Sequence, residues 1–135
     1  MRAKEFLSEG LAQDRAEQLI GAFIDFAAEH LELDELPQIE LQRQNGRSVE
    51  HKSFGGYAPS ERHISVTMTN RHIMDVCRTL AHELVHFRQD LRNELGPDSG
   101  KTGSPHENEA NAEAAVIMRN WGKLHPKLFA QPAID

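Results

Sequence analysis

Residues 82–86 of the chain are His-Glu-Leu-Val-His, an H-E-x-x-H motif. Two histidines four residues apart lie on one face of an α-helix, one turn above the other. The imidazoles of His82 and His86 can therefore reach one Zn²⁺ ion at the ~2.0–2.1 Å that zinc–nitrogen bonds require. Glu83 falls beside that face, where a carboxylate can accept a proton from water activated by the metal. The motif thus predicts two metal ligands and a general base.

The residues around the motif favour a buried metal site over two solvated surface histidines. Apolar residues recur at helical spacing on both sides of it, which predicts one long helix over residues 71–95. Asn70 is expected to cap the start of this helix, and Gly96-Pro97 to end it. A buried histidine pair needs polar partners, and a metal ion satisfies both rings.

The third metal ligand has to come from farther along the chain, because a catalytic zinc ion usually has three protein ligands. Three candidates compete in the segment that begins 20 residues beyond His86: Glu107, Glu109 and His106. Glu107 is preferred, since Asn111 lies one turn later on the same helix face and could orient a histidine ligand. A helix capping box would also explain a glutamate at position 107.

The rest of the chain predicts an α+β fold with a short antiparallel sheet. Residues 4–30 show helical spacing of apolar residues and predict one or two helices. Residues 38–42 alternate and predict a strand that is closed by the turn pair Asn45-Gly46. Residues 53–59 predict a second extended segment, and residues 63–68 the strongest strand. We expect the motif helix to pack across this sheet, with an edge strand that can pair with an extended peptide.

A second helix is predicted after the motif, with Ser104 as its N-cap and Pro105 in its first turn. It should run to about Trp121 and end at Gly122. At 135 residues the chain is expected to form a single metallopeptidase-like domain. Its expected parts are a helical N-terminal part (1–33), a catalytic core (37–122) and a loosely packed tail (123–135).

Composition and charge limit the kinds of partner and the cellular location that we expect for this protein. The net charge of −6 argues against nucleic acid or an anionic membrane as the main partner. No apolar run approaches the ~18–20 residues that span a bilayer, and the first residues carry no signal-peptide core. Cys77, the one cysteine, allows no intrachain disulfide. We therefore expect a cytoplasmic protein with a protein or peptide substrate.

These residues resemble those of known zinc peptidases. The chain is similar to the H-E-x-x-H plus glutamate class, the gluzincins, and more closely to small ImmA/IrrE-like peptidases. In the latter the second helix carries E-x-x-A-N-x-x-A, which is matched here by Glu107, Ala110, Asn111 and Ala114. The resemblance implies that Glu107 is the third zinc ligand. Glu113 departs from the family pattern, which usually has an aromatic residue there.

A second resemblance is to small metallopeptidase-like proteins encoded by tailed phages. It rests on residues 54–57, 78–86 and 107–112, and covers roughly residues 37–122. This likeness implies proteolysis with Zn²⁺ as the cofactor. It also implies a phage protein that acts in the host cytoplasm.

The preferred hypothesis is a zinc peptidase in which His82, His86 and Glu107 bind the metal and Glu83 is the general base. A second electrophile would stabilise the tetrahedral oxygen. Tyr57 and His106 are the main candidates for contacting the substrate or transition state. His63 and His72 are further candidates, and Gln89 and Asp90 could orient the ligands. The alternatives are a non-catalytic metal-binding structural or adaptor protein, and a helical interaction domain without metal.

Overall fold

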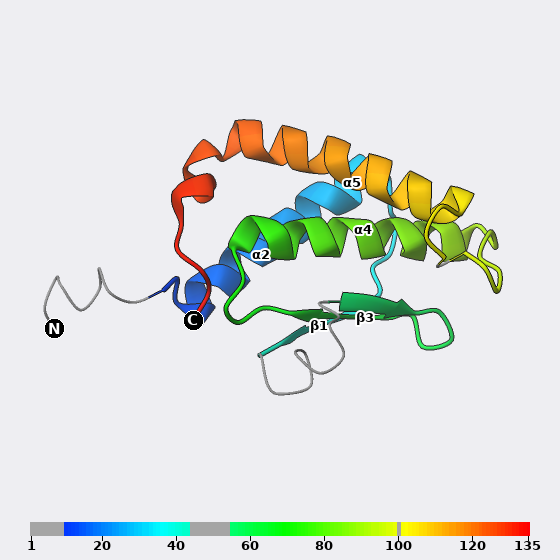
Figure 1. The fold of residues 1–135 in the computed structure, drawn as a ribbon, viewed down its shortest axis with the longest axis horizontal. Helices are drawn as coiled ribbons and strands as arrows, with labels where there is room; N and C mark the ends of the chain where they lie inside the picture. The colour runs from blue at the N-terminus through cyan, green and yellow to red at the C-terminus, as the bar shows by residue number, and fades with distance from the viewer. Residues whose placement is uncertain (1–9, 44–54, 100) are drawn as a thin grey trace, which may run out of the picture.

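The computed structural model describes residues 10–43, 55–99 and 101–135, which form an α+β fold (Figure 1). Helix α4 lies between the sheet on one side and helix α5 on the other, and α2 packs against both helices. The elements in chain order are α2 (Gln13–His30), β1 (Gln38–Gln42), β2 (Gly55–Ala58), β3 (His63–Thr67), α4 (Ile73–Leu91), α5 (Pro105–Leu124) and a 3₁₀ helix, η1 (Pro126–Ala130). The predicted fold class is confirmed, with the motif on the central helix.

The sheet is mixed, so the prediction of an antiparallel sheet is wrong. Its order is β1-β3-β2, with β1 parallel to β3 and β2 antiparallel to it. Strand β3 buries Ile64 and Val66 completely, and this apolar strand takes the centre while the other two flank it. The predicted turn at Asn45-Gly46 lies outside the described residues.

Helix α4 begins at Ile73, and its cap is His72, not the predicted Asn70. The Nδ1 atom of His72 accepts the backbone N–H of Met74 at 3.1 Å. Asn70 has a left-handed φ of 64°, and its N–H donates to the Ile134 carbonyl at 2.8 Å. The chain turns at Asn70, so the residue that enters the helix is two positions later.

Helix α4 also ends earlier than predicted, at Leu91 instead of beside Gly96. Asn93 has a φ of 57°, the left-handed conformation that glycine often supplies after a helix. The N–H of Asn93 donates to the Asp90 carbonyl, and that of Glu94 to the Gln89 carbonyl, both at 2.9 Å. This Schellman-type turn leaves residues 95–99 free to form a separate loop.

Helix α5 starts as predicted, with the Ser104 hydroxyl accepting the N–H of Glu107 at 3.1 Å. It continues past the predicted end, to Leu124. Gly122 is therefore inside the helix and is not its cap. A Cβ atom on Gly122 would lie 2.8 Å from the Phe129 ring, so the glycine allows that ring to pack against α5.

The two ends of the described chain pack together, which corrects one prediction. Residues 10–12 precede α2 without helical structure, and Leu11 forms a bridge with Ile134; residues 4–9 of the predicted helix lie outside the described residues. The N–H of Leu11 donates to the Ala133 carbonyl at 2.8 Å. Leu128 and Ile134 are buried and anchor the tail, whereas most other residues of 123–135 are exposed.

Helices α2, α4 and α5 each bury one apolar face. Phe23 of α2 meets Trp121 of α5 edge to face, with ring centroids 5.2 Å apart. Among residues 10–43, 55–99 and 101–135, no helix combines the length and hydrophobicity needed to cross a membrane.

Candidate metal centre

Three side chains that can bind metal converge where α4 meets the start of α5. His82 and His86 come from α4, and Glu107 comes from the first turn of α5. The Nε2 atoms of the two histidines are 3.2 Å apart. The Glu107 oxygens lie 2.8 Å from Nε2 of His82 and 3.0 Å from Nε2 of His86. Within the part of the chain that the structure describes, this is the only group of three that could hold a metal ion.

The donor set and its spacing fit a divalent metal. Ligands bound at ~2.0–2.1 Å in tetrahedral geometry are about 3.3 Å apart, close to the distance between the two Nε2 atoms. Two imidazoles and a carboxylate are also the three protein ligands of some catalytic zinc sites. His82, His86 and Glu107 therefore form a possible metal-binding group.

Local sequence explains why these atoms meet. The i, i+4 spacing places the rings of His82 and His86 edge to face on one side of α4, with their centroids 4.8 Å apart. Ala110 and Ala114 of α5 are buried, and their small side chains let the two helices approach closely. The Ser104 cap fixes the first turn of α5 and with it the backbone of Glu107.

The other two candidates for the third ligand point to different partners. Glu109 accepts a hydrogen bond from Nε2 of Gln89 at 2.6 Å. The Nδ1 atom of His106 lies 2.8 Å from the Ser99 hydroxyl. Of the three candidates, Glu107 is the one whose carboxylate lies beside both motif histidines.

An amide side chain contacts His86 on the side of the ring that faces away from Glu107. The Oε1 atom of Gln89 lies 2.8 Å from Nδ1 of His86, and both residues are buried. Asn111 of α5 partly offsets the lowering of the His82 pKa by burial. The sequence had named Gln89 and Asn111 as residues that could orient ligands, but it gave no sign that Glu109 supports Gln89.

Burial tunes the ionisation of the site. It lowers the pKa of His82, and the neighbouring His86 lowers it further while Glu107 acts in the opposite direction. A lowered pKa favours the neutral imidazole, which is the form that binds metal. Burial also raises the pKa of Glu83 to about 7; His86 opposes this shift and Glu107 adds to it. A carboxylate with such a pKa can accept and return a proton near neutral pH.

A cleft of about 340 Å³ opens over the three side chains. Strand β2 with the turn after it supplies one wall, and the loop after α4 supplies another. The lining residues are Tyr57, Pro59, His82, Glu83, His86, Leu95, Gly96, Ser99 and Glu107. A small molecule or a segment of extended chain can therefore reach the metal-binding group from solvent.

Of the remaining residues that the sequence suggested for substrate contact, one lines this cleft and the others do not. Tyr57 lines it, but its hydroxyl donates to Asp90 at 2.5 Å, and burial together with Asp90 raises the pKa of Tyr57 above its usual range. His106 is not in the lining and lies behind Ser99. His63 faces Glu40 on the sheet at 3.4 Å, and His72 caps α4. Ser99 was not identified from the sequence.

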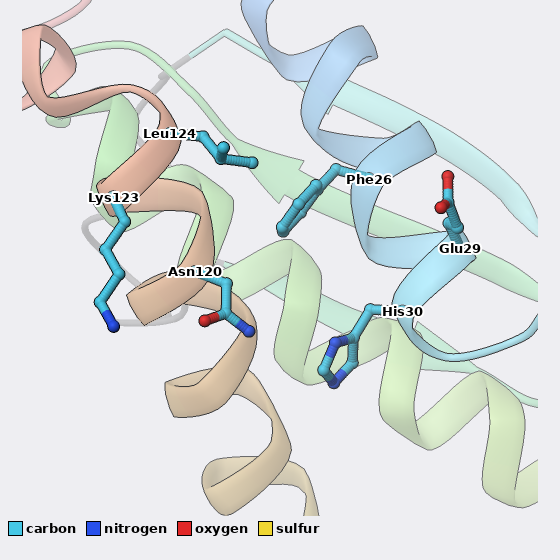
Figure 2. Close-up of a pocket in the computed structure, with 6 residues that line it drawn as sticks. All are labelled: Phe26, Glu29, His30, Asn120, Lys123 and Leu124. Carbon is cyan, nitrogen blue, oxygen red and sulfur yellow. The ribbon is translucent and has the colours of Figure 1, made fainter.

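A second hollow, of about 450 Å³, lies between α2 and α5. Figure 2 shows its six lining side chains, which are Phe26, Glu29, His30, Asn120, Lys123 and Leu124. Leu124 points toward Phe26, whereas Glu29 and Lys123 lie at opposite ends of the groove. This larger groove therefore contains one histidine and one carboxylate that do not belong to a metal-binding group.

No protein-family model, curated protein or solved structure matches this chain. The likeness to gluzincins, to ImmA/IrrE-like peptidases and to phage proteins remains a prediction from the motif residues. The structure itself supports a possible His-His-Glu metal-binding group at the meeting point of α4 and α5.

Proposed function

We propose that the protein is a zinc-dependent peptidase that hydrolyses peptide bonds in the cleft between β2 and the loop after α4. The observation that carries this proposal is the combination of a His-His-Glu group with a second acidic residue, Glu83, in one open cleft. Glu83 lines that cleft beside the two histidines, and its raised pKa suits proton transfer. A purely structural metal site has no need of such a residue.

The chain would supply the ligands and the proton carrier. His82, His86 and Glu107 would hold Zn²⁺, which when bound polarises a carbonyl group and lowers the pKa of water. Glu83 would take one proton from the attacking water as its oxygen bonds to the peptide carbonyl carbon. It would then give this proton to the leaving amine as the C–N bond breaks. The products are a carboxylic acid and an amine.

The sheet gives the cleft a means of aligning an extended substrate. Strand β2 is an outer strand in the order β1-β3-β2, and it carries Tyr57 into the cleft lining. A peptide that added to this side of the sheet would run along the cleft with its backbone held by hydrogen bonds. This arrangement favours a protein or peptide substrate.

The decisive experiment compares wild type with Glu83→Gln on a broad peptide library, with cleavage products identified by mass spectrometry. We expect the wild type to cleave and Glu83→Gln to lose cleavage while both proteins retain stoichiometric zinc. A wild type that binds zinc and cleaves nothing would favour the metal-binding adaptor. A wild type without affinity for divalent metal would overturn the metal site itself.

A further inference from the structure

Gln89 is the most completely buried polar side chain among the residues that the structure describes. It lies on α4 one turn beyond His86 and is 0% exposed. Its Oε1 atom is 2.8 Å from Nδ1 of His86. Its Nε2 atom donates to the His106 carbonyl at 3.0 Å and to Oε1 of Glu109 at 2.6 Å. One amide therefore connects a motif histidine of α4 with the first turns of α5.

The donor and acceptor inventory of these groups fixes the orientation of the amide. An amide nitrogen carries two hydrogens, and its oxygen carries none. The His106 carbonyl can only accept, and so can the Glu109 carboxylate, hence both must face the nitrogen of Gln89. The Oε1 atom of Gln89 is then left to face His86, and it can only accept.

The orientation of the amide in turn fixes the proton on His86. Since the Gln89 oxygen accepts, Nδ1 of His86 must carry the hydrogen. The neutral ring then has its lone pair on Nε2. That atom faces the Glu107 carboxylate at 3.0 Å and His82 at 3.2 Å. The lone pair of His86 therefore faces a carboxylate oxygen, which favours a cation between them.

We propose that Gln89, oriented by Glu109, is a positioning residue that keeps the hydrogen of His86 on Nδ1 and presents Nε2 to the metal. This inference rests on the proposed metal site and adds the means by which one ligand is prepared for it. Partners behind a ligating histidine set its tautomer and ring orientation. In this protein the partner of His86 is the neutral amide of Gln89. The Glu109 carboxylate contacts that amide and not the histidine.

Glu109 itself is held at the surface of the two helices. Its second oxygen lies 3.9 Å from the Arg88 guanidinium, which also bonds Glu113 at 2.8 Å. The chain of contacts from Arg88 through Glu109 and Gln89 to His86 thus runs between α4 and α5. A substitution of Glu109 should therefore affect the His86 ring only through the side-chain amide of Gln89.

The test measures where the His86 proton resides and how tightly zinc binds. Gln89→Met keeps the length of the side chain and removes both the acceptor and the donors. In metal-free protein at alkaline pH, imidazole ¹⁵N shifts should show the proton on Nδ1 in wild type and on Nε2, beside Glu107, in Gln89→Met. Zinc affinity, measured by competition with a chelator, should fall by about 10–100-fold in Gln89→Met. Glu109→Ala should show a smaller fall in zinc affinity in the same direction.

The controls separate positioning from stability. Gln18→Met, on the exposed face of α2, should change neither the ¹⁵N shifts nor the zinc affinity. A merely structural role for Gln89 predicts a lower melting temperature with the His86 proton still on Nδ1 and zinc affinity within about twofold of wild type, the scale of a surface change; that result overturns the proposal. If Gln89→Met does not fold, Glu109→Ala decides by the same two measurements. If wild type binds no zinc, the proposed function fails, while the ¹⁵N shifts still decide the role of Gln89.

Discussion

Among the described residues, the groove beside α2 and the cleft over the motif histidines both border α5, and the smaller of these two hollows holds the possible metal-binding group. The groove between α2 and α5 has a volume of about 450 Å³, against about 340 Å³ for the cleft over His82 and His86. In the cleft, the Nε2 atoms of His82 and His86 are 3.2 Å apart, and each lies within 3.0 Å of a Glu107 oxygen. In the groove, Glu29, Asn120 and Lys123 are exposed at its rim. Convergence of polar atoms therefore distinguishes the candidate site from the groove, whereas volume does not.

The strongest test of the difference between the two hollows removes one histidine from each. We expect His86→Ala to abolish stoichiometric zinc binding, a loss beyond the ~100-fold that removal of an outer-shell partner causes. His30→Ala, in the groove, should leave zinc binding unchanged. Metal content after dialysis, followed by chelator competition, measures both. Equal zinc binding by the two variants would refute the assignment of the site.

The next largest effect is expected on catalysis. Glu83→Gln should lower peptide hydrolysis by about 10²–10⁴-fold, the usual contribution of a general base. The matched variant Glu29→Gln, on the groove, should hydrolyse peptides at the wild-type rate. Rates with a cleaved library peptide give the ratio. Wild-type turnover by Glu83→Gln would assign the proton transfer to another group.

Removal of zinc should destabilise the fold, and this effect should depend only on the metal-binding group in the cleft. Zinc at a hundred times its Kd adds about 2.7 kcal/mol, which corresponds to a melting temperature higher by roughly 10 °C in a chain of this size. Chelation should remove this difference, as read by thermal unfolding with and without zinc. His86→Ala should melt at the same temperature in both conditions. A zinc-dependent shift in that variant would place the stabilising metal elsewhere.

The metal-free protein should lose stability in acid because of His82. Burial lowers the pKa of His82, so the folded state takes up a proton less readily than the unfolded chain. The stabilising contribution of the neutral ring is present above the unfolded pKa of ~6.5 and is lost as pH falls below it. Urea unfolding of metal-free wild type and His82→Gln across this range tests the prediction. Parallel pH curves for the two proteins would contradict it.

The smallest effect is expected in the groove. Leu124 is 63% exposed, and Leu124→Ser should change the free energy of unfolding by no more than about 0.5 kcal/mol. Leu84→Ala, in the fully buried core of α4, should cost about 2–5 kcal/mol in the same urea titration. A loss of more than 1 kcal/mol in Leu124→Ser would mean that the groove contributes to the fold (the usual surface effect being about 0.5 kcal/mol).

The sequence predicted the parts of the site that depend on local geometry. His82 and His86 belong to one helix, so their spacing alone put them on one face. Glu107 comes from another helix, and it was preferred because Asn111 lies on the same helix face and because residues 107–114 match the pattern E-x-x-A-N-x-x-A. The support of Gln89 by Glu109 had no local signature, because it joins residues on different helices.

The error in the sheet has the same origin, whereas the errors at the helix ends are local. The sheet order depends on which strand occupies the buried central position. Contacts between residues far apart in sequence determine this position. The end of α4 was misplaced because Asn93 took the left-handed conformation that was expected of a glycine. The close packing of Gly122 against Phe129 was equally invisible from helix-capping rules.

Because α4 ends at Leu91, the two motif histidines lie on a helix and part of the cleft entrance lies on the loop that follows it. His82 and His86 lie upstream of the stop at Asn93, while Leu95, Gly96 and Ser99 line the cleft from the loop beyond it. Insertions or deletions in this loop would reshape the entrance without shifting the metal-binding nitrogens. Sequence changes in this loop can therefore alter the entrance, while α4 keeps the two imidazoles in place.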